Sequence, residues 1–513
     1  MALDGLPQER WTPEMAAHLL NRAGFGGTPA EVEALYQRGH AGAVDWLLDI
    51  PPGDGVAAPP VWANPFTARR DELLGPMPMR GSDRDADRQA RQRVVRQREE
   101  SWLFDLRAWW LYRMRHTTTP LQEKMTLFFH GHFATGYEKV RSAYAMFLQN
   151  QTFRRHATGN WRALVEAVTR DPAMLIYLDG IENAKGAPNE NYAREVMELF
   201  TLGEGHYTEA DIREAARAFT GWRFNRRLFT MEFVPSRHDA GRKSFMGKKG
   251  AFTAEDIVGL ILEQPQAARW LAAKLWTYFA YENPEPAVVD ALAATLRRAD
   301  YDLAPALRAV FMSRAFYGTR AFRTQVKSPV QWMIGTLRML DAPMPETLQV
   351  QRTLASLGQQ LFDPPNVKGW DGGITWITTA SLALRYEAGA RFAHQRGQAR
   401  ARDRMLDHRE TILAEARALD LDIVLPSTDT PWLREASGPA LDWARLLPDE
   451  VRHSKRAALD NLLWRLYQTG LRERERALFA AYLDQLPDTA RWTESTCGDA
   501  LAALINTPAF QLT

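Results

Sequence analysis

The chain has 513 residues, of which 45% are hydrophobic and 25% charged, and its net charge at pH 7 is +2. This composition is typical of a folded globular protein and excludes an intrinsically disordered one. The small net charge gives no general electrostatic reason to expect nucleic-acid binding. The one cysteine, Cys497, excludes an intrachain disulfide and a zinc site made of cysteines.

The sequence contains no stretch close to the ~18 uninterrupted apolar residues that a membrane span needs. Its first seven residues lack the basic and then apolar order of a signal peptide. From the sequence as written we expect a cytoplasmic protein, or an exported one if a leader has been removed.

Helix signals begin close to the N-terminus. Thr12 and Pro13 are typical of an N-cap and a first helical position, and the glycine-rich residues 24–27 should end that helix. Thr28 opens a second helix, in which Glu31 completes a capping box.

Helical periodicity continues along most of the chain. We expect helices at about 83–114, from 120 into 128–133, 141–149, 160–170, 189–202, 208–220, 253–263, 265–281, 285–298, 303–313, 328–340, 346–361 and 378–417. Only residues 224–246 show the loose alternation of a β-hairpin. The sequence predicts a mainly α fold: a large multi-helical assembly with a small β-hairpin insertion, as a main domain (1–385) with a helical C-terminal subdomain (386–513) packed on it.

The segment 189–203 is the most informative one in the chain. Apolar side chains recur at helical spacing and predict a buried face. Asn191, Glu195 and Glu198 form a second stripe at i, i+4 and i+7, and Gly203 is placed to end the helix.

Two interpretations of this stripe are open. The i, i+4 pairs of Arg194 with Glu190 and Glu198 fit an exposed ladder worth about 0.3–0.5 kcal/mol per pair. Two asparagines near the start are, however, costly in a helix, and Glu195 and Glu198 repel each other unless something compensates. We favour one wall of a functional site.

Three further groups carry candidate chemistry. His130 and His132 flank a glycine, and in an extended segment both imidazoles would point the same way, as in a metal site. The alternative is that each packs among the neighbouring phenylalanines. His238, Asp239 and Lys243 lie in a glycine-containing loop, which is either a flap over a polar ligand or a solvated tip.

The third group is aromatic. Trp370 and Trp376 stand with Asn366 in a loop at 362–377 rich in proline and glycine, and Trp222 follows a glycine. Flat indole faces beside amides suit sugar stacking, whereas the alternative is that the indoles fill the core. The sequence has no G-x-S-x-G elbow and no phosphate-binding glycine loop, so serine nucleophiles and nucleotide binding lack support.

Together these motifs resemble the bacterial family known as domain of unknown function 1800. The matching pieces are LLNRAGFG at 19–26, FHGHF at 129–133, DPAML at 171–175 with YLD at 177–179, the 189–203 helix, AFTGW at 218–222, HDAGRK at 238–243 and PPNVKGW at 364–370. The resemblance implies no named activity. Members often look exported and are often encoded beside a sulfatase-like family, which implies a partner of that kind.

Our leading hypothesis is a hydrolase acting on a carbohydrate or a similar polyhydroxylated polymer, without a required cofactor. Glu195 and Glu198, with Glu190 or Asp239, would supply the acid and the base or nucleophile. The substrate would be bound by polar and stacking side chains: Asn189, Asn191, Arg194, His238, Lys243, Asn366, Trp222, Trp370 and Trp376.

Two alternatives belong to other classes of protein. The first is a metalloenzyme in which His130, His132 and the same glutamates bind a divalent metal. The second is a non-catalytic helical partner protein of the sulfatase-like neighbour.

Overall fold

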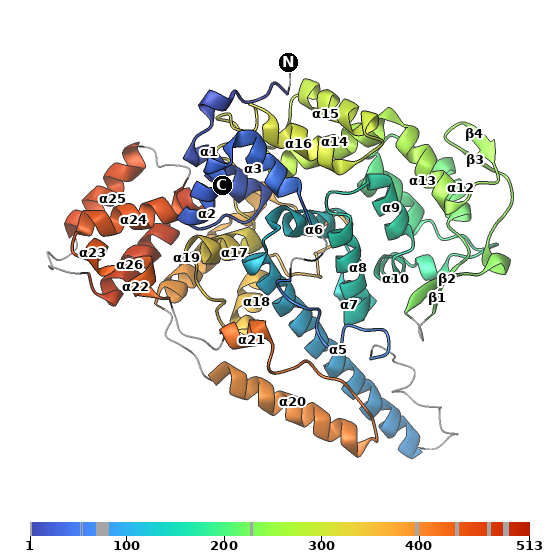
Figure 1. The fold of residues 1–513 in the computed structure, drawn as a ribbon. Coiled ribbons are helices and arrows are strands. Elements are labelled where there is room, and N and C mark those ends of the chain that lie inside the picture. Colours follow the sequence, from blue (N-terminus) through green and yellow to red (C-terminus); the bar gives the residue numbers. More distant parts are fainter. Residues whose placement is uncertain are drawn as a thin grey trace.

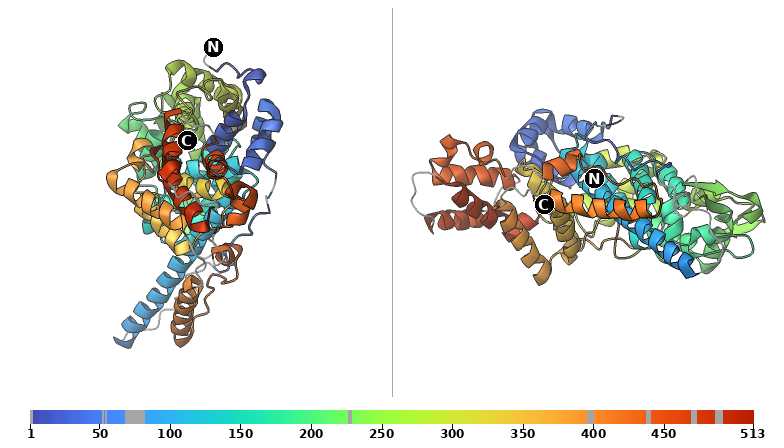
Figure 2. Two further views of the ribbon diagram at one scale, coloured as in Figure 1. Left: turned by 90° about the vertical axis from the view of Figure 1, so that its left-hand side faces the viewer. Right: turned by 90° about the horizontal axis from the view of Figure 1, so that it is seen from below.

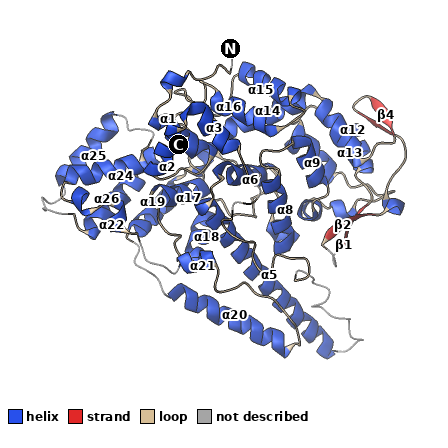
Figure 3. Ribbon diagram, in the orientation of Figure 1, coloured by secondary structure: helices blue, strands red, loops and turns tan. Residues whose placement is uncertain are grey.

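The computed structural model describes residues 3–51, 53, 55–67, 82–225, 229–394, 400–436, 441–468, 473–485 and 492–513 (Figure 1). It confirms a mainly α fold with two small antiparallel sheets (Figure 3). Within these ranges, no helix combines the length and the apolar character that a membrane crossing requires.

The first half of the chain is almost entirely helical up to its sheets. Its helices are α1 (Pro13–Ala23), α2 (Pro29–Gln37), α3 (Gly39–Leu48), α5 (Ser82–His116), α6 (Pro120–His132), α7 (Tyr137–Val140), α8 (Ala143–Arg155), α9 (Trp161–Thr169), α10 (Pro172–Tyr177), α11 (Asn191–Glu195) and α12 (Glu209–Ala218). The short η1 (Gln8–Arg10) and η2 (Gly180–Glu182) are 3₁₀ turns, and η3 (Val196–Thr201) is a π-helix.

The second half repeats this pattern. Its helices are α13 (Ala254–Glu263), α14 (Pro265–Phe279), α15 (Pro286–Arg298), α16 (Leu303–Met312), α17 (Pro329–Met339), α18 (Thr347–Ser356), α19 (Thr379–Ala393), α20 (Arg400–Ala418), α21 (Pro431–Ala436), α22 (Trp443–Leu446), α23 (Asp449–Arg452), α24 (Lys455–Leu466), α25 (Glu473–Gln485) and α26 (Glu494–Ile505). The 3₁₀ turns here are η4 (Pro235–Arg237), η5 (Gly373–Trp376) and η6 (Pro508–Gln511).

The helix-start signals act as the sequence predicts. The Thr12 side chain accepts a hydrogen bond from the Met15 amide, and Thr28 forms a reciprocal capping box with Glu31. Every helix expected from periodicity has a helical counterpart, although α18 ends at Ser356, earlier than expected. The one helix expected at 378–417 corresponds to two helices, α19 and α20, and residues 395–399 lie outside the described ranges.

The β region contains two hairpins where the sequence predicted one. β1 (Trp222–Asn225) pairs with β2 (Thr230–Phe233), and β3 (Lys243–Phe245) pairs with β4 (Lys248–Gly250). Met246 and Gly247 join β3 to β4 with φ values of 47° and 78°, as in the two-residue turns that match the twist of paired strands.

Two large cores hold the helices together. The first draws on α1 to α3, α6, α9 and α11 to α16. The second joins α5, α8, α17 and α18 to α24 and α26, so that Trp332 and Leu501, for example, belong to the same apolar cluster. The C-terminal helices therefore pack on the rest of the protein through a shared core. α5 and α20 project together from the body (Figure 2).

The last described residues return to the middle of the chain. Leu512 forms an antiparallel bridge with Val326, and the Thr513 carbonyl accepts a hydrogen bond from Arg22 Nη1 at 3.0 Å. The Arg22 guanidinium, which is buried, also donates to the carbonyl of Phe279 at 2.9 Å. One arginine thus joins three segments that are far apart in sequence.

Candidate functional site

The 189–203 segment is helical, but it is not one α-helix as predicted. α11 gives way after Glu195 to the π-helix η3, in which the Leu202 amide donates to the Met197 carbonyl at 2.9 Å. The Thr201 hydroxyl also donates to the Val196 carbonyl, and Gly203 ends the segment with φ +87°. Because a π-turn is wider than an α-turn, Glu195 and Glu198 are separated by a distorted turn of the kind often found at functional sites.

Glu195 and Glu198 lie on the half-buried side of this segment. Desolvation by burial, followed by the charge of Glu198, raises the pKa of Glu195, while Arg194 and Lys368 act in the opposite direction. In the described part of the chain, no donor hydrogen-bonds the Glu195 carboxyl. Glu198 accepts a hydrogen bond from the Tyr207 hydroxyl at 2.8 Å.

Arg194 and Glu190 belong to the surface. Arg194 makes two hydrogen bonds of 2.9 and 2.8 Å to the exposed Glu209, and its contact with Glu190 is longer, at 3.8 Å. Of the predicted ladder, only the long Arg194–Glu190 contact is formed, because Glu209 is the main partner of Arg194.

A polar cluster at the end of α10 faces the start of α11. Asp179 adopts the left-handed conformation, with φ +58°, and its carboxylate accepts a hydrogen bond from Lys139 at 2.9 Å. The same carboxylate accepts a hydrogen bond from the side-chain amide of Asn191 at 3.2 Å. Asn191 is thus held beside α7 and α10.

The loop that follows Leu361 packs on the end of α6. Gly369, with φ +88°, lies so close to Gly131 that a β-carbon on it would be 2.1 Å from the Gly131 carbonyl oxygen. The Trp370 ring lies over Gly131, with its buried indole N–H unpaired among the described residues. Lys368 is exposed and close enough to Glu195 to lower its pKa.

Asp363, at the start of this loop, is a site residue that sequence reasoning missed. Its carboxylate accepts a hydrogen bond from the Glu138 amide at 3.2 Å, and desolvation raises its pKa. The pKa of Tyr177 is raised by desolvation and then by the charges of Asp363 and Glu195, so its phenol lies near both carboxyls. The signal was present, since Asp363 precedes the PPNVKGW motif and Tyr177 opens YLD.

The prediction of an extended segment at His130 and His132 is wrong. α6 continues to His132, so the two imidazoles leave the helix in different directions. The glycine between them permits the close approach of the 369–370 backbone and is not a break in the helix.

Both histidines are buried and held by protein groups. His132 Nε2 is 2.9 Å from the Phe200 carbonyl, and His130 Nε2 is 3.1 Å from the Asn150 amide nitrogen. Burial lowers the pKa of each imidazole to about 3, which keeps both neutral. No group of three or more candidate metal ligands occurs within the ranges that the structure describes. This arrangement favours the packing alternative.

The residues of the HDAGRK loop form a separate cluster at the end of α12. Asp239 accepts a hydrogen bond of 2.7 Å from Arg217, which, as the largest cause, lowers the pKa of Asp239 to about 2. His238 Nδ1 is 2.9 Å from the Thr220 carbonyl, and the buried Lys243 amine donates to the loop's own carbonyls at Asp239 (2.6 Å) and Gly241 (3.1 Å). These bonds hold His238, Asp239 and Lys243 against the protein's own groups.

The remaining predicted ligand-binding residues have mixed positions. Trp376 is only 8% exposed and Trp222 packs edge-on against Phe233, so neither fits the stacking role as well as the half-buried Trp370. The Asn189 side chain accepts a hydrogen bond from the backbone N–H of Asn191 at 2.9 Å. Asn366 is exposed and accepts a hydrogen bond from the Lys368 amide at 2.8 Å, so each asparagine stabilises a turn.

A family model described as "Protein of unknown function (DUF1800)" matches residues 18–512. The chain belongs to the DUF1800 family. No curated protein and no solved structure matches it.

The geometry shows which DUF1800 motifs meet in space. The HGH segment, the YLD turn, the 191–201 helix and the DPPNVKGW loop converge on one half-buried surface, which we call the carboxylate site: Tyr177, Asp179, Lys139, Glu195, Glu198, Asp363, Lys368 and Trp370. The HDAGRK motif of this DUF1800 chain is tied to Arg217 on α12, and Arg237, directly before it, donates to the Ile181 carbonyl at 3.2 Å. β1, which begins at the tryptophan of AFTGW, contacts η2 directly after Asp179 and so borders the carboxylate site.

Proposed function

We propose that the carboxylate site is the active site of a hydrolase acting on a carbohydrate or a similar polyhydroxylated polymer. The observation that carries this proposal is the state of Glu195. It is a half-buried carboxyl with a raised pKa, beside a second carboxyl and without a hydrogen-bond donor in the described part of the chain. A carboxyl whose pKa is raised beside a second carboxyl suits the role of a general acid.

The neighbouring groups have roles that follow from their contacts. Glu195 donates the proton to the leaving oxygen, and Glu198, oriented by Tyr207, supplies the second carboxylate that activates water or attacks directly. Asp179 and Lys139 offer an ionic pair of the kind that binds hydroxyl groups. Trp370, which packs on Gly131, offers an apolar surface.

The proposal is tested with the purified full chain on a panel of polysaccharides, including glucans, xylan, chitin and peptidoglycan. Release of new reducing ends is measured. We expect Glu195→Gln and Glu198→Gln each to lower the rate by about 10²–10⁴-fold, the usual contribution of acid–base catalysis.

Glu190→Gln is the matched control, because Glu190 lies on the same segment but makes only the long surface contact with Arg194. It should keep the wild-type rate. The proposal fails if the wild-type chain processes no member of the panel, or if the Glu195 and Glu198 variants keep the wild-type rate.

A further inference from the structure

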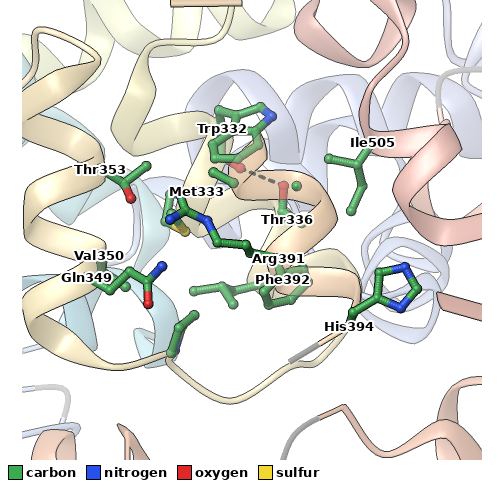
Figure 4. Close-up of a pocket in the computed structure, with 14 residues that line it drawn as sticks. Trp332, Met333, Thr336, Gln349, Val350, Thr353, Arg391, Phe392, His394 and Ile505 are labelled. Atoms are coloured by element: carbon green, nitrogen blue, oxygen red, sulfur yellow. Dashed lines mark hydrogen bonds between the residues drawn. The ribbon is translucent and has the colours of Figure 1, made fainter. Parts of the chain in front are cut away.

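A cavity of about 520 Å³ lies between α17, α18, α19 and α26 (Figure 4). It shares no residue with the carboxylate site. Its walls are mostly apolar and include Met333, Leu337, Val350, Phe392 and Ile505. The volume is within the range of about 300–1,000 Å³ that is usual for small-molecule sites.

The cavity opens into a polar annex. A second space of about 430 Å³ shares Gln349, Thr353 and Arg391 with the first and adds Arg352 and Glu346, among others. Figure 4 shows Arg391 reaching from α19 toward Gln349 and Thr353 on α18. The annex holds two guanidinium groups, Arg352 and Arg391, and Arg391 stands where the apolar and polar parts meet.

The charge of Arg391 is only weakly engaged by the protein. Its nearest carboxylate is that of Glu387, one turn earlier on α19, at 3.7 Å, and both side chains are half exposed. An exposed pair of this length contributes little, so a ligand anion can replace Glu387 at small cost. A planar guanidinium is also the group best suited to bind a carboxylate through two parallel hydrogen bonds.

The apolar wall is held firmly on one side. A β-carbon at Gly389 would lie 2.6 Å from Asn506 Oδ1 and 2.9 Å from Ile505 Cγ2, so side chains at the end of α26 pack directly on the backbone of α19. This close packing supports a preformed cavity, which does not have to be opened at the moment of binding.

We propose that this cavity binds a small amphipathic carboxylate, with an acyl chain in the apolar part and the carboxylate head on Arg391 at the annex. The apolar walls select the chain, and the weakly paired guanidinium of Arg391 selects a negative head over a neutral or positive one. The occupant is a medium-chain acid or the same acyl acid group presented by a larger molecule.

The test uses calorimetric titration of the full chain with octanoate, octan-1-ol and octylammonium, which share a chain and differ in head charge. We expect saturable binding of octanoate near one per chain, weaker binding of octan-1-ol and none of octylammonium. Equal binding of all three, or no saturable octanoate binding at millimolar concentration, overturns the proposal.

Three variants locate the site. Arg391→Gln should weaken octanoate roughly tenfold, as expected for losing a charge-assisted hydrogen bond, and leave octan-1-ol unchanged. Glu387→Gln, a surface change that frees Arg391, should tighten octanoate.

Val350→Phe fills part of the apolar cavity. It should abolish the binding of octanoate but keep that of butanoate, which has a shorter chain. A melting temperature for each variant verifies folding. Unchanged octanoate affinity in both the Arg391 and the Glu387 variants refutes this location, whatever happens to Val350→Phe.

Discussion

Gly369 and Gly131 bring two distant motifs together at backbone distance: a β-carbon on Gly369 would lie 2.1 Å from the Gly131 carbonyl oxygen. Backbone atoms cannot move aside as a flexible side chain can. The absence of a side chain at position 369 therefore allows the loop carrying Lys368 and Trp370 to lie on α6.

We predict that Gly369→Ala lowers the free energy of unfolding by roughly 3 kcal/mol, because it adds this collision to the strain of a left-handed residue. Gly186→Ala is a matched control, since Gly186 has φ +87° but no neighbour within 4 Å of its β-carbon position. It should lose only about 1 kcal/mol. Urea unfolding measures both, and equal losses would show that the close approach is unimportant.

The carboxylate site predicts how activity depends on pH. If Glu195 acts while protonated, the rate falls as the pH rises through its raised pKa. Lys368 lowers that pKa and the charge of Glu198 raises it. Lys368→Met should therefore move the descending limb of the pH–rate profile to higher pH, and Glu198→Gln should move the limb of its residual activity to lower pH. Shifts in the reverse directions would exclude Glu195 as the acid.

The buried Lys124 should make the stability of the protein depend on pH. Burial, and then the charge of Arg22, lowers its pKa to about 7, and its ammonium lies over the rings of Phe25 and Tyr278. Between pH ~7 and the ordinary lysine pKa of about 10.4 the unfolded chain binds a proton that the folded chain does not, so stability rises with pH across this window.

Lys124→Met should reduce that rise but not remove it, because the buried Lys327, whose pKa is also lowered to about 7, contributes to it as well. The variant should stabilise the protein at pH 7 by about 2 kcal/mol, because it removes the cost of burying a charge. The exposed Lys249→Met serves as the control and should change neither quantity. Denaturant unfolding from pH 7 to 10 measures the slope. A Lys124 variant with the wild-type slope would contradict the assignment.

An Asp239 variant tests whether the HDAGRK loop takes part in the proposed catalysis. Its ion pair with Arg217 holds the loop after His238, so Asp239→Asn should cost about 1 kcal/mol of stability, the usual contribution of one hydrogen bond. Because its pKa is lowered, to about 2, its contribution is present at neutral pH and is lost as the pH falls through that value. Turnover per folded molecule should not change. A large loss of turnover at unchanged stability would show that Asp239 takes part in catalysis.

The helices could be predicted from the sequence because their signals are local. Thr12 and Thr28 cap the first two helices, and apolar periodicity fixes the helices from α12 to α17 within a few residues. The π-turn at Val196–Thr201 could not be predicted, since it depends on where the surrounding core places the apolar face.

The candidate site was predicted only in part, because only some of its residues are marked by local signals in the sequence. Glu195 and Glu198 stand out through their spacing on one helix. Asp363 and Tyr177 are far apart in the sequence and meet only through tertiary packing. A β-carbon on Gly136 would lie 3.3 Å from an atom of each. The two histidines misled the prediction, because a glycine between them has the same appearance in a sequence whether it breaks a helix or admits a neighbouring backbone.

The bond from Arg22 to Thr513 joins residues 491 positions apart. During vectorial synthesis on the ribosome, the first helix is made long before its last hydrogen-bond acceptor exists. Until then a guanidinium destined for the interior has no complete set of carbonyls to receive it. The hydrogen bonds that receive the buried Arg22 guanidinium can therefore be completed only after residue 513 has been synthesised.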